Sequence, residues 1–438
     1  MRVSMNNLVG ACISVALLAA CGGSNGLSSS TPMSVAPQIT APLSQTPTWL
    51  TAERTHVRPA YSVLYSFKRG TGDGALPEAG LLNVKGTLYG TTEYGGANGH
   101  GTVFSITTSG AETVLKRFNR KKGSHPQAGL INVRGTLYGT TANGGSGLCS
   151  NSLNKVVGCG TVFSMTTSGA ETVLRSFAGG SGDGAYPFAG LINVKGTLYG
   201  TTEYGGATNE GTVFAISTSG AETVLHNFGT GSGDGVYPYA GLLNVKGTLY
   251  GTTEGGGANC SARGGCGTVF KITTAGVENV LYSFKADPDG EHPFAGLINV
   301  NGTLYGTTDE GGTYCESSSA FGCGTVFAIT TSGTETVLNS FGAGSGDGSY
   351  PDAGLLNVKG TLYGTTSSGG AYAYGGTVFK ITTSGAETVL HSFEGPAGDG
   401  SLPFAGLINV NGTLYGTTGY GGSGSCEIGC GTVFSLSP

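Results

Sequence analysis

The chain has 438 residues, of which 83 are glycine and only 11% are charged, with a formal net charge of −5. This length suits two or three ordinary domains or one large repeat domain. The sequence has no Gly-X-Y period, which excludes collagen, and its small acidic charge without a basic run argues against a nucleic-acid partner.

The first 20 residues are typical of an export signal, because Arg2 precedes a short apolar core from Leu8 to Ala20. The core is too short for a strong transmembrane candidate, and no other apolar run reaches spanning length. Residues 18–22, Leu-Ala-Ala-Cys-Gly, resemble the lipobox of bacterial lipoproteins. The resemblance implies lipidation at Cys21 and, from the glycine that follows, an outer-membrane location. An ordinary cleaved signal with an incidental cysteine is the alternative.

Residues 21–60 are rich in Ser, Thr, Pro and Ala and show no periodicity. This composition predicts a flexible tether with stiffer proline segments between the lipid and a folded domain. We therefore expect a lipoprotein signal peptide over residues 1–20, a tether over 21–60 and one repeat domain over 61–438.

The repeat domain is organised by the segment Gly-Thr-Leu-Tyr-Gly-Thr-Thr. It occurs seven times, beginning at Gly86, Gly135, Gly196, Gly247, Gly302, Gly360 and Gly412. Successive starts lie 49 to 61 residues apart. A period of this size indicates stacked supersecondary units, as in a propeller, a solenoid or an array.

Each repeat predicts four strands, which in the third copy span residues 190–194, 197–202, 211–217 and 222–228. Lys195-Gly196 is a two-residue hairpin turn between the first two strands. Apolar pairs such as Val103-Phe104 place apolar groups on both faces of a strand, which suits blades covered on both sides by their neighbours. A β-solenoid is the alternative, although its coils are usually shorter than these repeats.

The two ends of the array favour a closed ring. The seventh copy stops after its third strand at Leu436, whereas residues 61–67 match a fourth strand and follow no first three. Pairing these two ends would protect the strand edges that an open array exposes. The sequence thus predicts an all-β fold, a seven-bladed β-propeller of four-stranded blades whose last blade is closed by the N-terminal strand 61–67.

The segments Leu-Tyr-Gly-Thr-Thr, Gly-Gly, Gly-Thr-Val-Phe and Thr-Ser-Gly-Ala-Glu-Thr-Val-Leu resemble the GloVer tandem repeats of bacterial exported "choice-of-anchor" proteins. The resemblance covers about residues 61–438. It implies a β-propeller and surface anchoring. It implies no activity, because that family is functionally uncharacterised.

Eight of the ten cysteines form four local pairs, in which the second cysteine directly precedes the glycine of a third strand: Cys149/Cys159, Cys260/Cys266, Cys315/Cys323 and Cys426/Cys430. The other three copies lack both members. This all-or-none pattern in an exported chain predicts local disulfides. Zinc is the alternative, but pairs on different blades would be too far apart to supply four ligands. We expect no metal and no cofactor.

A Gly-Asp-Gly or Asp-Gly motif precedes most first strands, with its carboxylate at Asp73, Asp183, Asp234, Asp289, Asp347 and Asp399. Asp-Gly is an ordinary pair for a tight turn. Calcium binding is the alternative, although one carboxylate per loop is few for an ion that takes six to eight oxygens.

Sequence variation, including all four cysteine pairs, is concentrated in the loops before the first strand and after the second, which should share one face of a propeller. Varied loops on a repeated scaffold usually carry the binding residues. Each of these loops before a first strand contains an X-Pro step. Residue X, the residue two positions after it, and the acids that follow the second strand together predict an aromatic and acidic collar. Tyr94, Tyr204 and Tyr420 lie beside the acids or their equivalents. We predict that one side of a binding mouth consists of Tyr186, Phe188, Tyr237, Tyr239, His292, Phe294, Glu203, Glu254 and Asp309. Packing of the aromatic rings between blades, with solvated acids, is the alternative.

Catalysis has little support, because the sequence contains neither a Gly-x-Ser-x-Gly elbow nor a His-Glu-x-x-His motif. His226 and His391 share a fourth-strand position that we expect at the exposed rim. We expect a lipid-anchored cell-envelope propeller that binds an extracellular or periplasmic ligand or protein through its variable loops. The alternatives are an enzyme acting on carbohydrate or peptide at the channel mouth and a purely structural surface protein.

Overall fold

The computed structural model describes residues 59–260, 264–313, 315 and 322–438, which belong to one compact unit, Val57–Pro438. The predicted signal peptide, nearly all of the tether and Cys21 lie outside these residues. Within the described ranges, no helix is long and apolar enough to cross a membrane.

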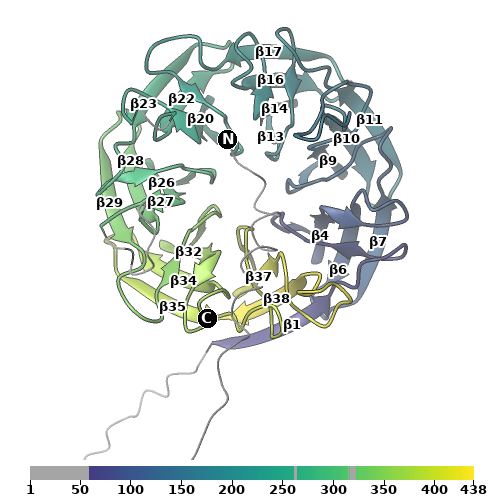
Figure 1. Ribbon diagram of the computed structural model, residues 1–438, viewed down its shortest axis with the longest axis vertical. Helices are drawn as coiled ribbons and strands as arrows, with labels where there is room; N and C mark the ends of the chain where they lie inside the picture. Colours follow the sequence, from purple (N-terminus) through teal and green to yellow (C-terminus); the bar gives the residue numbers. More distant parts are fainter. Residues whose placement is uncertain (1–58, 261–263, 314, 316–321) are drawn as a thin grey trace, which may run out of the picture. The chain divides into compact units, whose positions relative to one another are not determined.

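Seven antiparallel four-stranded sheets form a ring of blades (Figure 1). From the inner to the outer strand, blades 1 to 3 consist of β3 (Leu82–Val84), β4 (Thr87–Thr92), β6 (Thr102–Thr107) and β7 (Glu112–Arg117); β8 (Ile131–Val133), β9 (Thr136–Thr141), β10 (Thr161–Thr166) and β11 (Glu171–Ser176); and β13 (Ile192–Val194), β14 (Thr197–Thr202), β16 (Thr212–Ser217) and β17 (Glu222–Asn227).

The remaining four blades repeat this arrangement. Blades 4 to 7 consist of β19 (Leu243–Val245), β20 (Thr248–Thr253), β22 (Thr268–Thr273) and β23 (Glu278–Ser283); β25 (Ile298–Val300), β26 (Thr303–Thr308), β28 (Thr325–Thr330) and β29 (Glu335–Ser340); β31 (Leu356–Val358), β32 (Thr361–Thr366), β34 (Thr377–Thr382) and β35 (Glu387–Ser392); and β36 (Ile408–Val410), β37 (Thr413–Thr418), β38 (Thr432–Ser437) and β1 (Ala60–Ser66). The predicted fold class is therefore confirmed.

The inner strand is shorter than the sequence predicts. In blade 3, β13 begins at Ile192 and not at Gly190. The reason is that the chain at Gly190 turns toward the neighbouring blade, where a Cβ would lie 3.2 Å from the carbonyl oxygen of Gly129. The hairpin turn is as predicted, because Lys195 and Gly196 both have positive φ, 53° and 96°, as a type I′ turn requires.

The N-terminal strand closes the ring as predicted. β1 pairs with β38 in antiparallel register, with Tyr61 opposite Leu436 and Ser66 opposite Thr432. The purple strand β1 lies beside the yellow β38 in Figure 1. The N–H of Phe67 then donates a 3.0 Å hydrogen bond to the carbonyl oxygen of Gly431. The last blade thus takes its outer strand from the start of the domain.

The core lies between the blades, and one aromatic contact repeats at every junction. The phenylalanine after each outer strand meets the phenylalanine of the third strand in the next blade, as in Phe228 and Phe270, whose ring centroids lie 5.1 Å apart at 69°. The other six pairs are Phe67–Phe104, Phe118–Phe163, Phe177–Phe214, Phe284–Phe327, Phe341–Phe379 and Phe393–Phe434. Edge-to-face rings with this spacing add to the stability gained from burial alone.

The glycine before each third strand has an equally clear role. Gly211 has φ 100°, and a Cβ there would lie 2.5 Å from Cδ of Pro238, which belongs to the next blade. The repeated Gly-Thr-Val-Phe segment therefore needs glycine both for its backbone conformation and for the approach of the neighbouring proline.

Candidate functional site

The loop before the first strand and the loop after the second lie on one face, as predicted. In blade 3 they form a short ladder, in which β12 (Gly184–Ala185) pairs with β15 (Tyr204–Gly205). The same ladder recurs in four other blades: β2 (Gly74–Ala75) with β5 (Tyr94–Gly95), β18 (Gly235–Val236) with β21 (Gly255–Gly256), β24 (Gly290–Glu291) with β27 (Glu310–Gly311), and β30 (Gly348–Ser349) with β33 (Ser368–Gly369). We call this side the loop face.

The residue before the proline of each X-Pro step has a left-handed backbone. We call these seven positions, with φ between 52° and 59°, the collar residues: Leu76, His125, Tyr186, Tyr237, His292, Tyr350 and Leu402. Bulky residues rarely adopt this conformation, and a following proline disfavours the α region further. Such a backbone persists only where the surrounding structure holds it firmly, and it is frequent at ligand sites.

Two hydrogen bonds hold each collar residue. The N–H of Tyr237 donates to the carbonyl oxygen of Glu210 in blade 3 at 2.9 Å, and its carbonyl accepts from the N–H of Glu254 in blade 4 at 3.0 Å. Equivalent pairs of bonds occur at the other six collar residues. Each side chain therefore leaves a backbone fixed by two blades, so its direction is preorganised.

The predicted aromatic residues of blades 3 to 5 form a connected cluster. An outer row joins Tyr186 to Tyr204 and Tyr204 to Tyr237, with centroid distances of 5.9 and 5.4 Å. An inner row joins Phe188 to Tyr239 at 5.0 Å, stacked, and Tyr239 to Phe294 at 5.8 Å. Tyr186 contacts Phe188 at 6.5 Å, and His292 contacts Phe294 at 6.3 Å. We call these seven residues the aromatic patch.

The aromatic patch combines packing with partial exposure. Phe294 is buried, and the contact between Phe188 and Tyr239 crosses from blade 3 to blade 4, so the alternative of inter-blade packing holds for part of the set. Tyr186, Tyr204 and Tyr237 are half-buried. The outer row therefore has partly exposed rings, while Phe294 supports the inner row.

The three predicted acids are bound to the collar through their backbones. The N–H groups of Glu203, Glu254 and Asp309 donate to the carbonyl oxygens of the collar residues Tyr186, Tyr237 and His292, respectively, at 3.0 to 3.1 Å. All three acids are half-buried. Burial, with nearby Glu210, Glu203 and Glu254, raises the pKa of Tyr237 to about 12. The Tyr237 phenol is therefore a neutral hydrogen-bond donor at physiological pH.

The opposite side of the loop face is acidic. Burial raises the pKa of Glu93 to about 7, although hydrogen bonds from Gln127 and Tyr94 act in the opposite direction. Burial also raises the pKa of Glu78 well above its usual range, and the charges of Glu93 and Asp352 add to this effect. The loop face therefore has an aromatic half over blades 3 to 5 and an acidic half whose carboxyl groups come from blades 1 and 6, with Gln127 of blade 2 as a hydrogen-bond partner of Glu93.

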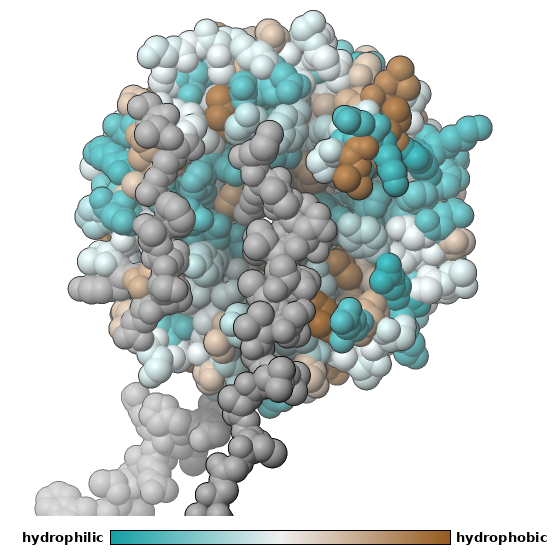
Figure 2. Space-filling view, viewed as in Figure 1, coloured by the Kyte–Doolittle hydropathy of each residue, from teal (hydrophilic) through white to brown (hydrophobic). Residues whose placement is uncertain are grey.

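Most of the surface seen in Figure 2 is hydrophilic or neutral, with a few hydrophobic spots. Among the described residues, three of the exposed large hydrophobic side chains, Leu148, Leu153 and Val156, belong to the loop between Cys149 and Cys159 or flank it. This loop joins β9 to β10 in blade 2 and lies outside the aromatic patch.

The four predicted cysteine pairs are disulfide-bonded, with Cα atoms 5.0 to 5.5 Å apart, within the range of natural disulfides. Each bond closes a loop between a second and a third strand on the loop face. Disulfides of this number are typical of exported proteins. The bonded pairs are Cys149–Cys159, Cys260–Cys266, Cys315–Cys323 and Cys426–Cys430.

The two cysteines of each pair have different surroundings. The first is half-buried on the loop face. The second belongs to the core between blades and is at most 2% exposed, as at Cys159, Cys266, Cys323 and Cys430.

The backbone of the second cysteine also holds the collar. This residue lies two positions before the third strand, and its carbonyl oxygen accepts the N–H of the next blade's collar residue at 2.9 to 3.0 Å. These bonds join Cys430 to Leu76, Cys159 to Tyr186, Cys266 to His292 and Cys323 to Tyr350. The second cysteine therefore supports the collar from beneath and presents no surface to a ligand.

The aspartate of the Gly-Asp-Gly motif caps a turn. Asp73 accepts hydrogen bonds from the N–H of Lys68 at 2.8 Å and from the N–H of Gly74 at 2.7 Å. Asp183 and Asp347 accept equivalent backbone hydrogen bonds. This geometry favours the turn interpretation of the motif.

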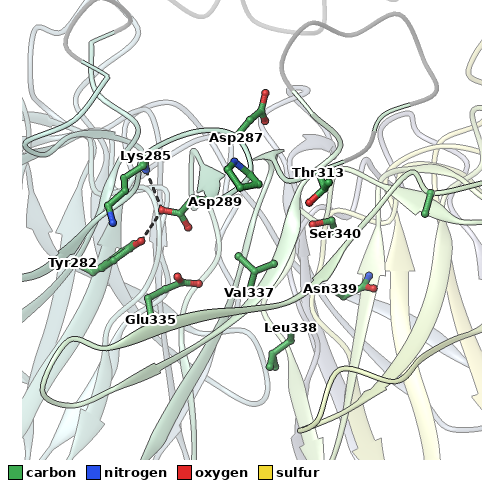
Figure 3. A pocket seen from close by; sticks show the side chains of 12 residues that line it. Tyr282, Lys285, Asp287, Asp289, Thr313, Glu335, Val337, Leu338, Asn339 and Ser340 are labelled. Carbon is green, nitrogen blue, oxygen red and sulfur yellow. Dashed lines mark hydrogen bonds between the residues drawn. The ribbon is translucent and has the colours of Figure 1, made fainter.

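These aspartates also face the outer strands of two blades, in what we call rim gaps. A rim gap contains a side chain near the end of one outer strand, the turn aspartate after it, and the first residue of the next outer strand. Figure 3 shows the gap between blades 4 and 5, where Tyr282, Asp289 and Glu335 line an open groove of about 810 Å³. The phenol of Tyr282 donates to Asp289 at 2.6 Å.

The two outer-strand histidines lie in other rim gaps. His226 and His391 are at the rim as expected, but the expectation of exposure was wrong, because only 17% and 18% of their side chains are exposed. The polar clusters in the rim gaps were not predicted from the sequence. The sequence does contain a pattern that indicates them, because a glutamate begins six outer strands and an aspartate follows most of these strands at a constant spacing.

The fold and the loop face define a repeat β-propeller that presents varied loops on one side. The chain belongs to the Gloeobacter/Verrucomicrobia repeat family, whose sequence model matches residues 53–152, 146–319 and 260–438. The family expected from the repeat motifs is thus confirmed. Together with the disulfides, this bacterial family indicates an exported protein.

A search of curated proteins found no match. Among solved structures, a protein assigned as a 6-phosphogluconolactonase from Bacteroides uniformis is 12% identical, with a TM-score of 0.47, over 72% of this chain and 84% of that one. PorZ, a surface component of the type-IX secretion system of Porphyromonas gingivalis, is 15% identical, with a TM-score of 0.47, over 84% of this chain and 47% of that one. Similarities this remote say nothing about function.

Proposed function

We propose that this protein is a lipid-anchored binding protein of the cell envelope, with its ligand seated on the aromatic patch. The observation that carries the proposal is the double row of rings over blades 3 to 5, in which Tyr186, Tyr237 and His292 have a strained backbone that neighbouring blades hold in place. Strain of this kind is common at ligand sites, and rigid aromatic rings lose little conformational entropy on binding.

The side chains of the patch suit a sugar or an ammonium-bearing ligand. Tyrosine rings offer flat apolar surface to the C–H face of a sugar or to a cation, and their hydroxyl groups donate hydrogen bonds. The backbones of Glu203, Glu254 and Asp309 are hydrogen-bonded to those of the patch residues Tyr186, Tyr237 and His292. Their carboxylates can accept hydrogen bonds from hydroxyl or ammonium groups of a ligand. A peptide with a basic side chain would satisfy the same groups.

The anchor supports the same function. A lipid on Cys21 followed by the tether over residues 22–60 would hold the propeller at a membrane surface and leave it free to meet ligands. The four disulfides suit an oxidising compartment. The membrane is thus one partner, and an extracellular or periplasmic ligand or protein is the other.

The test is binding of glycan and peptide arrays to the unit Val57–Pro438, followed by titration of each hit. Replacing Tyr237 and Tyr239 together with alanine should weaken binding at least tenfold. The matched control replaces Leu402 and Phe404, which occupy the same two positions in blade 7, and should bind normally. Equal binding by both variants, or unfolding of the tyrosine variant, would contradict the proposed site.

A second candidate function follows from the acidic half of the loop face. Glu93 is buried, its Oε2 atom has no hydrogen-bond partner among the described residues, and its pKa of about 7 is suited to a general acid. Hydrolysis of a carbohydrate or peptide would require this carboxyl group. Loss of turnover in Glu93→Gln, with unchanged binding to the aromatic patch, would favour an enzyme.

A further inference from the structure

The rim gap between blades 3 and 4 brings three different metal-ligating side chains together. His226 lies on β17, Asp234 in the loop after it, and Glu278 at the start of β23 in the next blade. One ligand atom from each residue lies within 4.8 Å of the others. The side chains are 17% exposed for His226 and 9% for Asp234, so the cluster is mostly shielded yet reachable from solvent.

One polar atom of each side chain is left unpaired in this gap. His226 Nε2, Asp234 Oδ1 and Glu278 Oε1 are buried and have no hydrogen-bond partner among the described residues. Nε2 of His226 lies 3.7 Å from Oδ2 of Asp234, which is too long for a hydrogen bond. An unpaired buried polar atom is costly, so a ligand that engages all three would stabilise the gap.

Other rim gaps compensate their carboxylates with protein groups. Lys116 pairs with Glu171 between blades 1 and 2. Between blades 2 and 3, Arg175 lies 2.7 Å from Asp183 and 3.3 Å from Glu222. Tyrosine hydroxyls donate to the aspartate in two further gaps. An unpaired glutamate oxygen recurs in several gaps, so the distinguishing feature here is the unpaired histidine nitrogen.

The second rim histidine makes a natural comparison. His391 Nε2 lies 2.7 Å from Asp399 Oδ2, a good hydrogen bond. Tyr61 occupies the position that Glu278 holds in the other gap, and its ring stacks on His391 at 3.8 Å. That gap therefore has a satisfied histidine and an aromatic ring in place of the second carboxylate.

We propose that His226, Asp234 and Glu278 form a binding site for a divalent transition-metal ion such as Zn²⁺. The ligands would be Nε2 of the histidine and one oxygen from each carboxylate, with water completing the coordination. Imidazole nitrogen with carboxylate oxygen suits Zn²⁺ better than Ca²⁺ or Mg²⁺, which prefer oxygen-only sites. Bonds of about 2 Å require the three side chains to draw slightly closer.

The electrostatics of the gap agree with a cation. Burial raises the pKa of Glu278 to about 7, Asp234 raises it further, and His226 lowers it. A bound cation would stabilise the charged carboxylate that burial disfavours. Because the ligands come from the outer strands of two blades, the ion would also link blade 3 to blade 4. No metal was expected from the sequence, in which Glu278 lies 52 residues from His226.

The experiment titrates the untagged, chelator-treated full chain with Zn²⁺ by calorimetry and follows the melting temperature. We expect one ion per chain and a rise in melting temperature. His226→Ala and the isosteric Glu278→Gln should each weaken Zn²⁺ binding at least tenfold. Two matched controls, His391→Ala and Glu335→Gln, alter equivalent positions in other rim gaps and should leave Zn²⁺ binding unchanged.

Three results would overturn the proposal. The first is the absence of Zn²⁺ binding to the wild-type chain, and the second is unchanged affinity in Glu278→Gln. The third is loss of binding in His292→Ala but not in His226→Ala, which would place the ion at the Glu291, His292 and Glu310 cluster on the loop face. The melting temperature of each metal-free variant shows whether it is folded, and Glu278→Gln retains the shape of the side chain.

Discussion

The hydroxyl of Thr417 donates a 3.3 Å hydrogen bond to the carbonyl oxygen of Ala79, which lies 338 residues earlier in the chain. The same bond joins neighbouring blades elsewhere, for example Thr201 to Ala240 at 2.9 Å. The junction between the last and first blades therefore uses the same contacts as the junctions within the chain. Together with β1, this bond makes the ring continuous.

Replacing Phe67 with alanine should destabilise the whole propeller. Phe67 is fully buried and meets Phe104 of blade 1 at 5.1 Å, so its loss opens a cavity at the closing junction. Large-to-small changes of this kind cost about 3–5 kcal/mol. Urea denaturation measures the free energy of unfolding. Val63→Ala is the control, because Val63 on the same strand is 38% exposed and should change stability little. Equal losses of stability in Phe67→Ala and Val63→Ala would contradict a role for Phe67 in closing the ring.

Replacing Gly101 with alanine should destabilise more than replacing Gly86. Both glycines have nearly the same φ, 89° and 88°. A Cβ at Gly101 would lie 2.6 Å from Cδ of Pro126 in the next blade, whereas none of the neighbouring atoms would lie within 4 Å of one at Gly86. Gly86→Ala should cost about 1–2 kcal/mol from backbone strain alone. A Gly101→Ala variant with the same melting temperature as Gly86→Ala would show that the blades adjust freely.

Stability should fall as the pH rises from about 4.3 to 7. Burial raises the pKa of Glu112, Glu278, Glu335 and Glu387 to about 7, whereas an unfolded glutamate titrates near 4.3. Between these values the folded state binds more protons than the unfolded state, so raising the pH favours unfolding. Urea denaturation in chelator at pH 4.5, 6 and 8 measures this slope. A variant with all four glutamates replaced by glutamine should show a weaker dependence of the unfolding free energy on pH. An unchanged dependence would contradict the raised pKa values of these glutamates.

Replacing Cys21 with serine should release the protein from the membrane if the proposed lipid anchor is correct, because the lipobox resemblance implies lipidation at this cysteine. Detergent phase partitioning of cell fractions measures the change. Cys12→Ser, within the predicted signal peptide, is the control and should leave membrane association intact. A Cys21→Ser protein that stays in the detergent phase would show that the anchor lies elsewhere.

The sequence allows the fold to be predicted in detail because each blade repeats local signals. Turn pairs such as Lys195-Gly196 and strands such as 197–202 are short-range features, and both were correct. The first strand was predicted too long, because Gly190 contacts a neighbouring blade and this contact leaves no periodic signal. The N-terminal strand was recognised since its residues match other outer strands.

The candidate site was predicted less completely. The loops that carry Tyr237 and Glu254 could be chosen because they vary, and the structure joins them by a hydrogen bond. The left-handed backbone at Tyr237 could not be anticipated, since a residue before proline ordinarily favours an extended conformation. The cluster of His226 with Glu278 depends on the packing of two blades, which no local pattern encodes.

The collar has a consequence for how such a protein could acquire new specificity. Leu, His and Tyr occupy its seven positions with φ values within a few degrees of one another, so backbone shape there does not depend on the side chain. Six of the seven side chains are partly exposed, whereas Leu76 is buried, and Tyr186 and Tyr237 share a contact with Tyr204. A substitution at a partly exposed collar residue should therefore change the side chain that the loop face presents while the backbone of the ring stays the same. A library randomised at these six positions would sample ligands on an unaltered ring.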